Sequence, residues 1–168
     1  MIEVFAIDPG SASSALVVLE VDDHDVRVAH AERSPNEDIL RGTLRSCVPL
    51  PERLMAVEVP RARGMPASNE LFETCVWAGR FIEALGVEHH YVDRHQVKLT
   101  LCGDARAKDP NIRAALIDRW GGSKAAAVGT KKSPGPLYGF KSDMWAALAV
   151  AETFIERELG ITEPVRAG

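Results

Sequence analysis

Cysteine is scarce in this sequence, and long apolar runs are absent. The 168 residues include three cysteines, Cys47, Cys75 and Cys102, which form neither a CxxC pair nor an even-numbered set. We therefore expect no zinc ribbon and no disulfide framework, but reduced thiols in a cytoplasmic protein. No apolar stretch approaches the about 20 residues that span a membrane. The first residues lack the basic segment that opens a signal peptide, so we expect neither secretion nor a membrane partner.

Lysine is missing from most of the chain. All six lysines lie between residues 94 and 141, where ten Lys and Arg residues accompany three Asp residues, a local net charge of +7. The rest of the chain carries −11, which brings the whole protein to −4. This asymmetry predicts a basic face that binds a polyanion, while the acidic remainder keeps the protein in solution. A solvated basic loop without a ligand is the alternative.

The overall composition is that of a folded domain. Apolar residues make up 46% of the sequence and charged residues 26%, which argues against wholesale disorder. At this length we expect one domain, spanning residues 1–168, with a core of its own. Residues 121–141 carry several Gly and Pro residues and show no periodicity, so we expect a basic loop there, either functional or disordered.

The apolar pattern predicts a mixed α/β fold. Strands are expected at Ile2–Asp8, Ser14–Val21, Val26–Arg33, Leu54–Val59 and Val87–Val92. Helices are expected after Ser34-Pro35 with Ser34 as the cap, at Asn69–Leu85, from Asp109-Pro110 to Trp120, and at Asp143–Leu159 with Ser142 as the cap. Three hairpin-linked strands followed by alternating units indicate a mixed five-stranded sheet, first antiparallel and then parallel, flanked by helices.

Three carboxylates occupy unusual positions. Asp8 ends an apolar strand and enters the tight turn Asp8-Pro9-Gly10-Ser11, Glu58 interrupts another apolar strand, and Asp143 opens the last helix. Each has a purely structural explanation: a turn residue, an ion pair inside the fold, and an acid at a helix N-terminus. If the first and fourth strands are neighbours, however, Asp8 and Glu58 emerge at one sheet edge, where the last helix could bring Asp143. Three converging carboxylates suit a pair of Mg²⁺ ions, which can promote phosphoryl transfer.

Four features, taken in order, resemble a known family. They are Asp-Pro-Gly between two strands, Val57-Glu58 at the end of the fourth strand, Gln96-Val97-Lys98 followed ten residues later by Lys108, and Asp143-x-x-Ala-Ala-Leu-Ala-Val-Ala in the last helix. Together they resemble RuvC-type Holliday junction resolvases of the RNase H-like superfamily, phage-encoded relatives in particular, over almost the whole chain. The resemblance implies an RNase H-like fold and a homodimeric, Mg²⁺-dependent endonuclease, with Mn²⁺ as a substitute. It also implies cleavage of four-way or otherwise branched DNA in a bacterial or phage-infected cell.

The same resemblance assigns roles to individual residues. It implies that Asp8 bridges two metal ions and that Glu58 and Asp143 complete the metal site. It places Lys98 or Lys108 near the scissile phosphate. All five residues would then take part in catalysis.

The resemblance leaves one ligand position unfilled. The family pattern ends with two acidic or His/Asp positions three residues apart, but Ala146 follows and Phe140 precedes Asp143 at that spacing. A fourth ligand is therefore missing or comes from elsewhere in the chain. Phosphate oxygens of bound DNA could also complete the coordination.

Basic residues outside the metal site are predicted to contact DNA. After the strand-four Glu the family often inserts an aromatic residue at the junction; this chain has Arg61 and Arg63 there, so we expect guanidinium contacts to phosphates or stacked bases. The predicted DNA-binding residues are Arg61, Arg63, Lys98, Lys108, Lys131, Lys132 and Lys141. The helix at about 69–85 carries apolar residues on more than one stripe, which predicts one face in the core and another against a second subunit.

Other functions stay open at the level of sequence. Another RNase H-like nuclease, specific for flaps, forks or RNA–DNA hybrids, would use the same residues. A junction-binding protein without catalysis is compatible with Ala146 at the ligand position. Nucleotide binding in the manner of actin and sugar kinases would need a second strand–Asp-x-Gly turn, which this sequence lacks.

Overall fold

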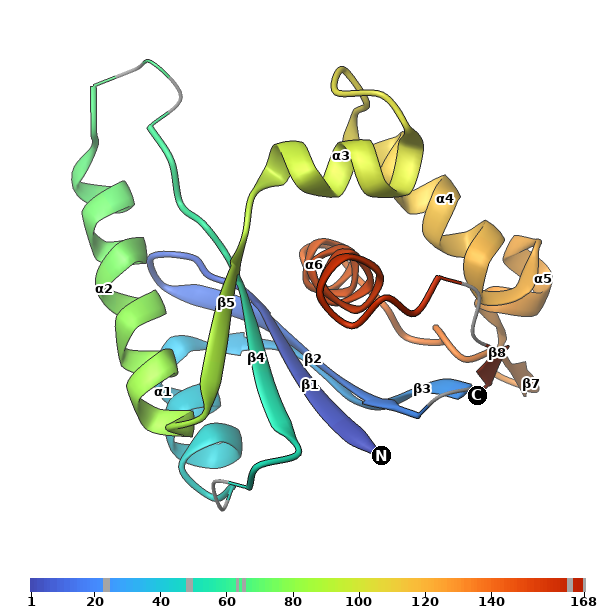
Figure 1. Ribbon diagram of the computed structural model, residues 1–168, viewed down its shortest axis with the longest axis horizontal. Coiled ribbons are helices and arrows are strands. Elements are labelled where there is room, and N and C mark those ends of the chain that lie inside the picture. The colour runs from blue at the N-terminus through green and yellow to red at the C-terminus, as the bar shows by residue number, and fades with distance from the viewer. Residues whose placement is uncertain (23–24, 48–49, 63, 65, 163–164, 168) are drawn as a thin grey trace.

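A mixed sheet forms the centre of the molecule (Figure 1). The computed structural model describes residues 1–22, 25–47, 50–62, 64, 66–162 and 165–167. The strands are β1 Ile2–Asp8, β2 Ser13–Val21, β3 Asp25–Pro35, β4 Arg53–Glu58, β5 Glu88–Val92 and β8 Val165–Ala167, in the order β5-β4-β1-β2-β3-β8. The β1–β2 and β2–β3 pairs are antiparallel, whereas β4 runs parallel to β1 and to β5. The predicted five-stranded mixed sheet is therefore confirmed, and the short β8 adds a parallel partner for β3.

Helices cover both faces of this sheet. They are α1 Asn36–Asp38, the π-helical turn η1 Ile39–Leu44, α2 Asn69–Leu85, α3 Arg94–Cys102, α4 Asp109–Gly121, α5 Lys124–Ala127 and α6 Met144–Glu158. Figure 1 shows α1 and α2 on one side of the sheet and α3, α4 and α6 on the other. Among the residues that the structure describes, no helix is both long enough and apolar enough to cross a membrane.

Alternation along β1 divides the core into two parts. Val4 and Ala6 belong to the apolar cluster that contains α6, whereas Phe5 and Ile7 belong to the cluster that contains α2. Successive side chains of a strand point to opposite faces, so Asp8 continues the row on the α6 side. The strand pattern that buries the core therefore also directs this carboxylate toward the helix that carries Asp143.

The helix α6 lies almost entirely inside the molecule. Its residues from Ala147 to Ile155 are all buried, which explains why its sequence is apolar on every side. Two buried residues of this stretch are polar. The Thr153 hydroxyl donates to the Ala149 carbonyl, and the Glu152 carboxylate accepts a 2.8 Å hydrogen bond from the Trp120 indole N–H and lies 3.6 Å from the Arg119 guanidinium. Because a buried carboxylate is costly without partners, this pairing fixes α4 against α6.

Two predicted helix caps are wrong. The helix α6 begins at Met144 with Asp143 as its N-cap residue, and the preceding Ser142 has a positive φ of 41° and caps nothing. The Asp143 carboxylate makes no capping hydrogen bond and pairs instead with an arginine of β3. At α1 the N-cap residue is Pro35, since β3 continues through it and the Ser34 hydroxyl donates instead to Glu32.

The segment 123–140 is more regular than its sequence predicts. It holds α5 and a hairpin of two-residue strands, β6 Gly129–Thr130 and β7 Ser133–Pro134. The segment is anchored by the buried Leu137, whose N–H donates to the Ala127 carbonyl at 2.8 Å. A Cβ at Gly135 would lie 2.2 Å from the Ala126 carbonyl oxygen, so this close approach requires glycine. Such contacts leave no periodic signal, which is why a loop was expected.

Candidate metal and nucleic-acid site

Asp8 and Glu58 lie side by side at the carboxyl ends of neighbouring strands. The strands β1 and β4 are parallel, and Ile7 pairs with Val57, so the next residue of each strand is one of the two acids. Ala6 and Ala56 also pair and both belong to the core cluster of α6, which places both acids on the α6 side. The prediction that Asp8 and Glu58 meet depended on the first and fourth strands being neighbours, and the structure shows that they are.

The carboxylates of the site repel one another. Burial, followed by the charges of Glu58 and Asp143, raises the pKa of Asp8 from 3.8 to about 7. Asp109 raises it further, and Arg94 opposes the shift. Four acids that come from four separate segments of the chain thus act on one small region.

Arg94 lies among these acids, although the sequence patterns did not single it out. It is the first residue of α3, and only 14% of its side chain is exposed. Its Nη1 lies 3.7 Å from Oε2 of Glu58, and its Nη2 pairs with Oδ1 of Asp109 at the start of α4. Asp109 was missed as well, because Asp-Pro at the start of a helix predicts a cap; the N-cap residue is in fact Lys108, and Asp109 is the first residue of α4. The available signal for Arg94 was its position at the start of the basic window.

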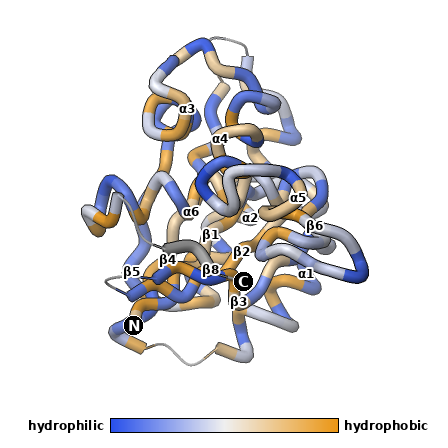
Figure 2. The backbone as a smooth tube through the Cα atoms, turned by 90° about the vertical axis from the view of Figure 1, so that its right-hand side faces the viewer, coloured by the Kyte–Doolittle hydropathy of each residue, from blue (hydrophilic) through white to orange (hydrophobic). Residues whose placement is uncertain are grey.

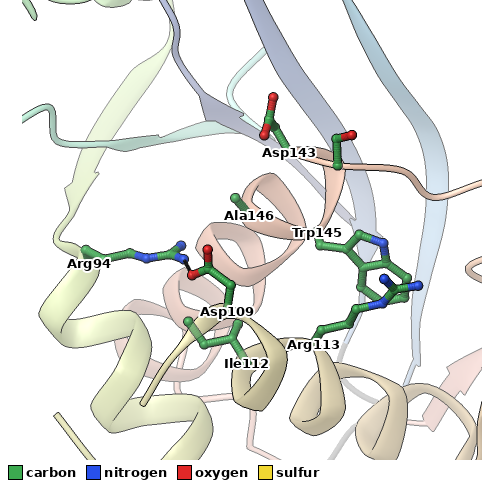
Figure 3. A pocket seen from close by; sticks show the side chains of 8 residues that line it. Arg94, Asp109, Ile112, Arg113, Asp143, Trp145 and Ala146 are labelled. Carbon is green, nitrogen blue, oxygen red and sulfur yellow. Dashed lines mark hydrogen bonds and ion pairs between the residues drawn. The ribbon is translucent and has the colours of Figure 1, made fainter. Parts of the chain in front are cut away.

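Asp143 has an arginine of its own. Nε of Arg33, on β3, lies 2.9 Å from Oδ2 of Asp143, and about half of each side chain is exposed. Figure 3 shows the Asp143 carboxylate directed away from the Arg94–Asp109 pair. Asp143, Glu58 and Asp109 therefore each lie within 4 Å of a guanidinium.

The carboxylate oxygens of the site suit a hard divalent cation, but the carboxylates do not converge on one point. Carboxylate oxygens are the ligands that Mg²⁺ and Mn²⁺ prefer, and the mutual repulsion at Asp8 would be relieved by a cation. Within the described residues, no three His, Cys, Asp or Glu side chains converge closely enough to hold a metal ion. The carboxylates would have to turn from their arginines to coordinate one.

A cavity of about 250 Å³ lies between α4 and α6 beside these acids (Figure 3). Its lining comprises Arg94, Asp109, Ile112, Arg113, Ser142, Asp143, Trp145 and Ala146. Ala146 presents only a methyl group to it, so α6 supplies no second acid at that point. Asp109 is the acid that another helix brings to the same cavity.

The turn after Asp8 is fixed by two buried polar side chains. The Gly10 N–H donates to the Ser14 hydroxyl at 3.0 Å, and the Asn36 amide donates to the Gly10 carbonyl at 2.9 Å. A Cβ at Gly10 would lie 2.3 Å from the Ser13 carbonyl oxygen, so this position requires glycine. These contacts hold the end of β1, and with it Asp8, in one position.

The basic residues predicted to meet DNA fall into two groups. Lys98 on α3 and Arg61 after β4 line one pocket together with Arg94, and Arg61 also pairs with Asp93 at 2.7 Å. Lys108 is exposed directly before α4. These three lie on the segments that flank the carboxylates.

The second group lies elsewhere on the molecule. Lys131 and Lys132 form the exposed turn between β6 and β7, which Figure 2 shows as a polar tip at the surface and Figure 1 separates from the end of β4. Lys141, in contrast, is exposed two residues before Asp143, so it belongs with the segments beside the carboxylates. Arg63 lies outside the described residues.

Comparisons of sequence and of structure give different results. No protein-family model matches the sequence, and no curated protein matches it. Solved structures do match the fold, and three of them are the following. Thermus thermophilus RuvC has a TM-score of 0.64 at 20% identity over 98% of this chain and 100% of its own. The same enzyme in complex with a Holliday junction substrate has a TM-score of 0.64 at 22% identity over the same shares. Fowlpox virus resolvase with Holliday junction DNA has a TM-score of 0.57 at 11% identity over 94% and 99%.

The topology and these likenesses define the class of the fold. Three antiparallel strands followed by parallel strands, with helices on both faces, form an RNase H-like fold. Within that class the chain has the RuvC-type fold, over nearly its whole length and that of the RuvC structures. The resemblance inferred from four short motifs is confirmed at the level of fold.

Proposed function

We propose that this protein is a metal-dependent endonuclease that cuts branched double-stranded DNA, four-way junctions in particular. The observation that carries the proposal is the adjacency of Asp8 and Glu58 at the ends of β1 and β4, within the electrostatic reach of Asp143. This acidic edge lies on a RuvC-type fold, and two of the similar structures are complexes with Holliday junction DNA.

The carboxylates of Asp8, Glu58 and Asp143 would hold Mg²⁺, with Mn²⁺ as a substitute. When bound, such ions supply Lewis acidity toward a phosphodiester and an attacking water. Asp8 is held rigidly by its turn, so it serves as the fixed ligand, while the other two acids rotate toward it. Lys98 and Lys108 flank this edge and would neutralise charge on the scissile phosphate.

The basic surface would position the DNA. Phosphate contacts depend on charge rather than base sequence, which suits recognition of a branched shape. The proposed contacts are Arg61, Arg63, Lys98, Lys108, Lys131, Lys132 and Lys141. Pairing of Arg61 with Asp93 keeps that guanidinium at the mouth of the carboxylate site, where a phosphate could replace the Asp93 carboxylate.

The helix α2 would join two copies of the chain. Phe72 and Val76 are 60% and 62% exposed and lie one helical turn apart, so they form an apolar stripe opposite the buried face of α2. A two-fold dimer through this stripe would present two carboxylate sites, one to each of two opposed strands of a four-way junction.

The decisive experiment measures cleavage of a strand-labelled four-way junction with Mg²⁺, with Mn²⁺ and with EDTA. We expect paired nicks in opposed strands with either metal and none with EDTA. Flap, fork, RNA–DNA hybrid and linear duplex substrates are run in parallel, and faster cleavage of any of them would redirect the proposal to another RNase H-like nuclease.

A second candidate is a junction-binding protein without catalysis. It is favoured by the methyl group of Ala146 in the cavity and by the arginine partners of Glu58 and Asp143. Tight junction binding without cleavage, at every divalent metal tried, would establish this candidate and overturn the nuclease.

A further inference from the structure

Arg94 lies between two carboxylates that belong to different parts of the fold. One is Glu58, at the end of β4, and the other is Asp109, at the start of α4. Only 14% of the Arg94 side chain and 15% of the Glu58 side chain are exposed, whereas 83% of the Asp109 side chain is exposed. The guanidinium therefore bridges the inner carboxylate of the site and an outer one.

The two contacts of this guanidinium are unequal. Nη2 is in close contact with Asp109, whereas Nη1 stands 3.7 Å from Glu58, beyond hydrogen-bonding distance. Asp109 lies in the first turn of α4, where the helix dipole adds to the stability of its negative charge. The outer carboxylate, whose pairing with Arg94 is drawn in Figure 3, therefore holds Arg94 back from the inner one.

A cation beside Glu58 competes with any metal ion for that carboxylate. The guanidinium repels an incoming cation, and its charge already stabilises the carboxylate to which the metal would bind. The strength of this competition depends on how closely Arg94 approaches Glu58. That approach is limited by Asp109.

From this geometry, and resting on the metal-dependent nuclease proposed above, we propose that Arg94 and Asp109 are positioning residues that set the metal affinity of the site. Arg94 screens Glu58 in the free protein and weakens metal binding. Asp109 draws Arg94 outward and so weakens its hold on Glu58. On metal entry Arg94 would keep its contact with Asp109 and move away from Glu58, so that neither Arg94 nor Asp109 needs to coordinate the ion itself.

The test measures Mn²⁺ binding to the DNA-free protein, from the electron paramagnetic resonance signal of the unbound ion. We expect Arg94→Gln to tighten binding by about fivefold and Asp109→Asn to weaken it by about threefold, sizes typical of one partly exposed ion pair. In the double variant, Asp109→Asn should have almost no further effect, because the arginine that it restrains is gone.

The double variant separates this inference from its rivals. If Asp109 is itself a metal ligand, or acts only through its charge, Asp109→Asn will weaken binding equally in the Arg94→Gln background, and the inference is wrong. An unchanged affinity in Arg94→Gln would also overturn it. Arg113→Gln is the matched control, because Arg113 lines the same cavity, lies 4.5 Å over the Trp145 ring and makes no ion pair within the part of the chain that the structure describes.

Two further variants keep the result interpretable. Arg94→Lys retains a positive charge for folding but cannot reach both carboxylates, so it should also tighten Mn²⁺ binding and it decides the matter if Arg94→Gln does not fold. Asp8→Asn should abolish binding. Failure of the wild-type protein to bind Mn²⁺ would overturn the proposed metal site as well as this inference. Binding that depends on Asp8 but is insensitive to Arg94 and Asp109 would overturn the inference alone.

Discussion

The hydroxyl of Ser14 donates a 2.7 Å hydrogen bond to the side-chain carbonyl of Asn36, and each residue is 1% exposed. The same two side chains bond the N–H and the carbonyl of Gly10. This buried network connects β2, the start of α1 and the turn that follows Asp8. All three segments therefore help to fix the position of the Asp8 carboxylate.

Removing the Asn36 amide should therefore destabilise the whole protein. Asn36→Ala leaves the Ser14 hydroxyl and the Gly10 carbonyl buried without their partner, a loss that typically costs about 1–3 kcal/mol. Urea denaturation in EDTA measures the difference in the free energy of unfolding. Ser46→Ala removes an exposed hydroxyl that donates to the Gly42 carbonyl, and this control should change stability by less than about 0.5 kcal/mol. Equal stabilities of the two variants would show that the turn is held by other contacts.

Asp8→Asn should abolish cleavage but not DNA binding. The substitution removes a proposed metal ligand and no basic group, so junction affinity should stay within about twofold while the cleavage rate falls by at least about 100-fold, beyond the loss typical of an outer-shell metal partner. Single-turnover kinetics measure the cleavage rate, and gel-shift titration of the same four-way junction measures the affinity. Cleavage at the normal rate would refute the assignment of Asp8.

Much of this site follows from residue patterns within strands. The apolar run of β1 predicts both its bounds and the carboxylate at its end, and Glu58 stands out because it interrupts a similar run. Adjacent parallel strands then bring the two acids together without any further information. The sequence therefore predicts the approximate bounds of these strands and the acidic residue at the end of each.

The arginine partners could not be predicted in the same way. Arg33 and Asp143 are 110 residues apart, and their pairing depends on how α6 crosses the sheet. The position of Arg94 between Glu58 and Asp109 depends on the pairing of β5 with β4 and on the packing of α4 against α3. These are tertiary relationships between elements, and no local period or spacing encodes them. The ion pairs of Arg33 and Arg94 with the acids of the site therefore could not be predicted from the sequence.

The raised pKa of Asp8 predicts an unusual dependence of stability on pH. Between the unfolded value of 3.8 and the folded value of about 7, the native carboxyl group binds a proton that the unfolded chain has released. The metal-free protein should therefore lose stability as pH rises from about 4 to about 7, by at most about 4 kcal/mol from this group. Thermal melting in EDTA across this range measures the effect.

Asp8→Asn again supplies the comparison for this pH dependence. Its neutral amide cannot titrate, so the melting temperature of the variant should fall less steeply between pH 4 and pH 7 than that of the wild type. Addition of Mn²⁺ at neutral pH should restore stability to the wild type alone. Parallel pH profiles for the two proteins would show that Asp8 has an ordinary pKa.

The exposed stripe of α2 predicts the oligomeric state. Replacing Phe72 and Val76 together with Glu puts two charges into the proposed dimer interface, where each lost apolar side chain is worth about 1.5–3 kcal/mol. The dimer dissociation constant, measured by analytical ultracentrifugation, should rise at least about 100-fold, with the fold retained because both side chains are exposed. Tyr138→Glu, an equally drastic change at an exposed aromatic outside α2, should leave the dimer intact. A wild-type monomer at high concentration would exclude this interface.

The turn between β6 and β7 offers the last test, because it lies apart from the carboxylates. If Lys131 and Lys132 each contact a phosphate, replacing both with Gln should weaken junction binding and reduce the salt dependence of the affinity by about two counterions. The measurement is the slope of log affinity against log salt concentration for the wild type and the double variant. Cleavage at saturating DNA should be unaffected, since the hairpin is separated from the end of β4 (Figure 1). An unchanged slope would show that the DNA path stays on the side of Arg61 and Lys98 and does not reach this hairpin.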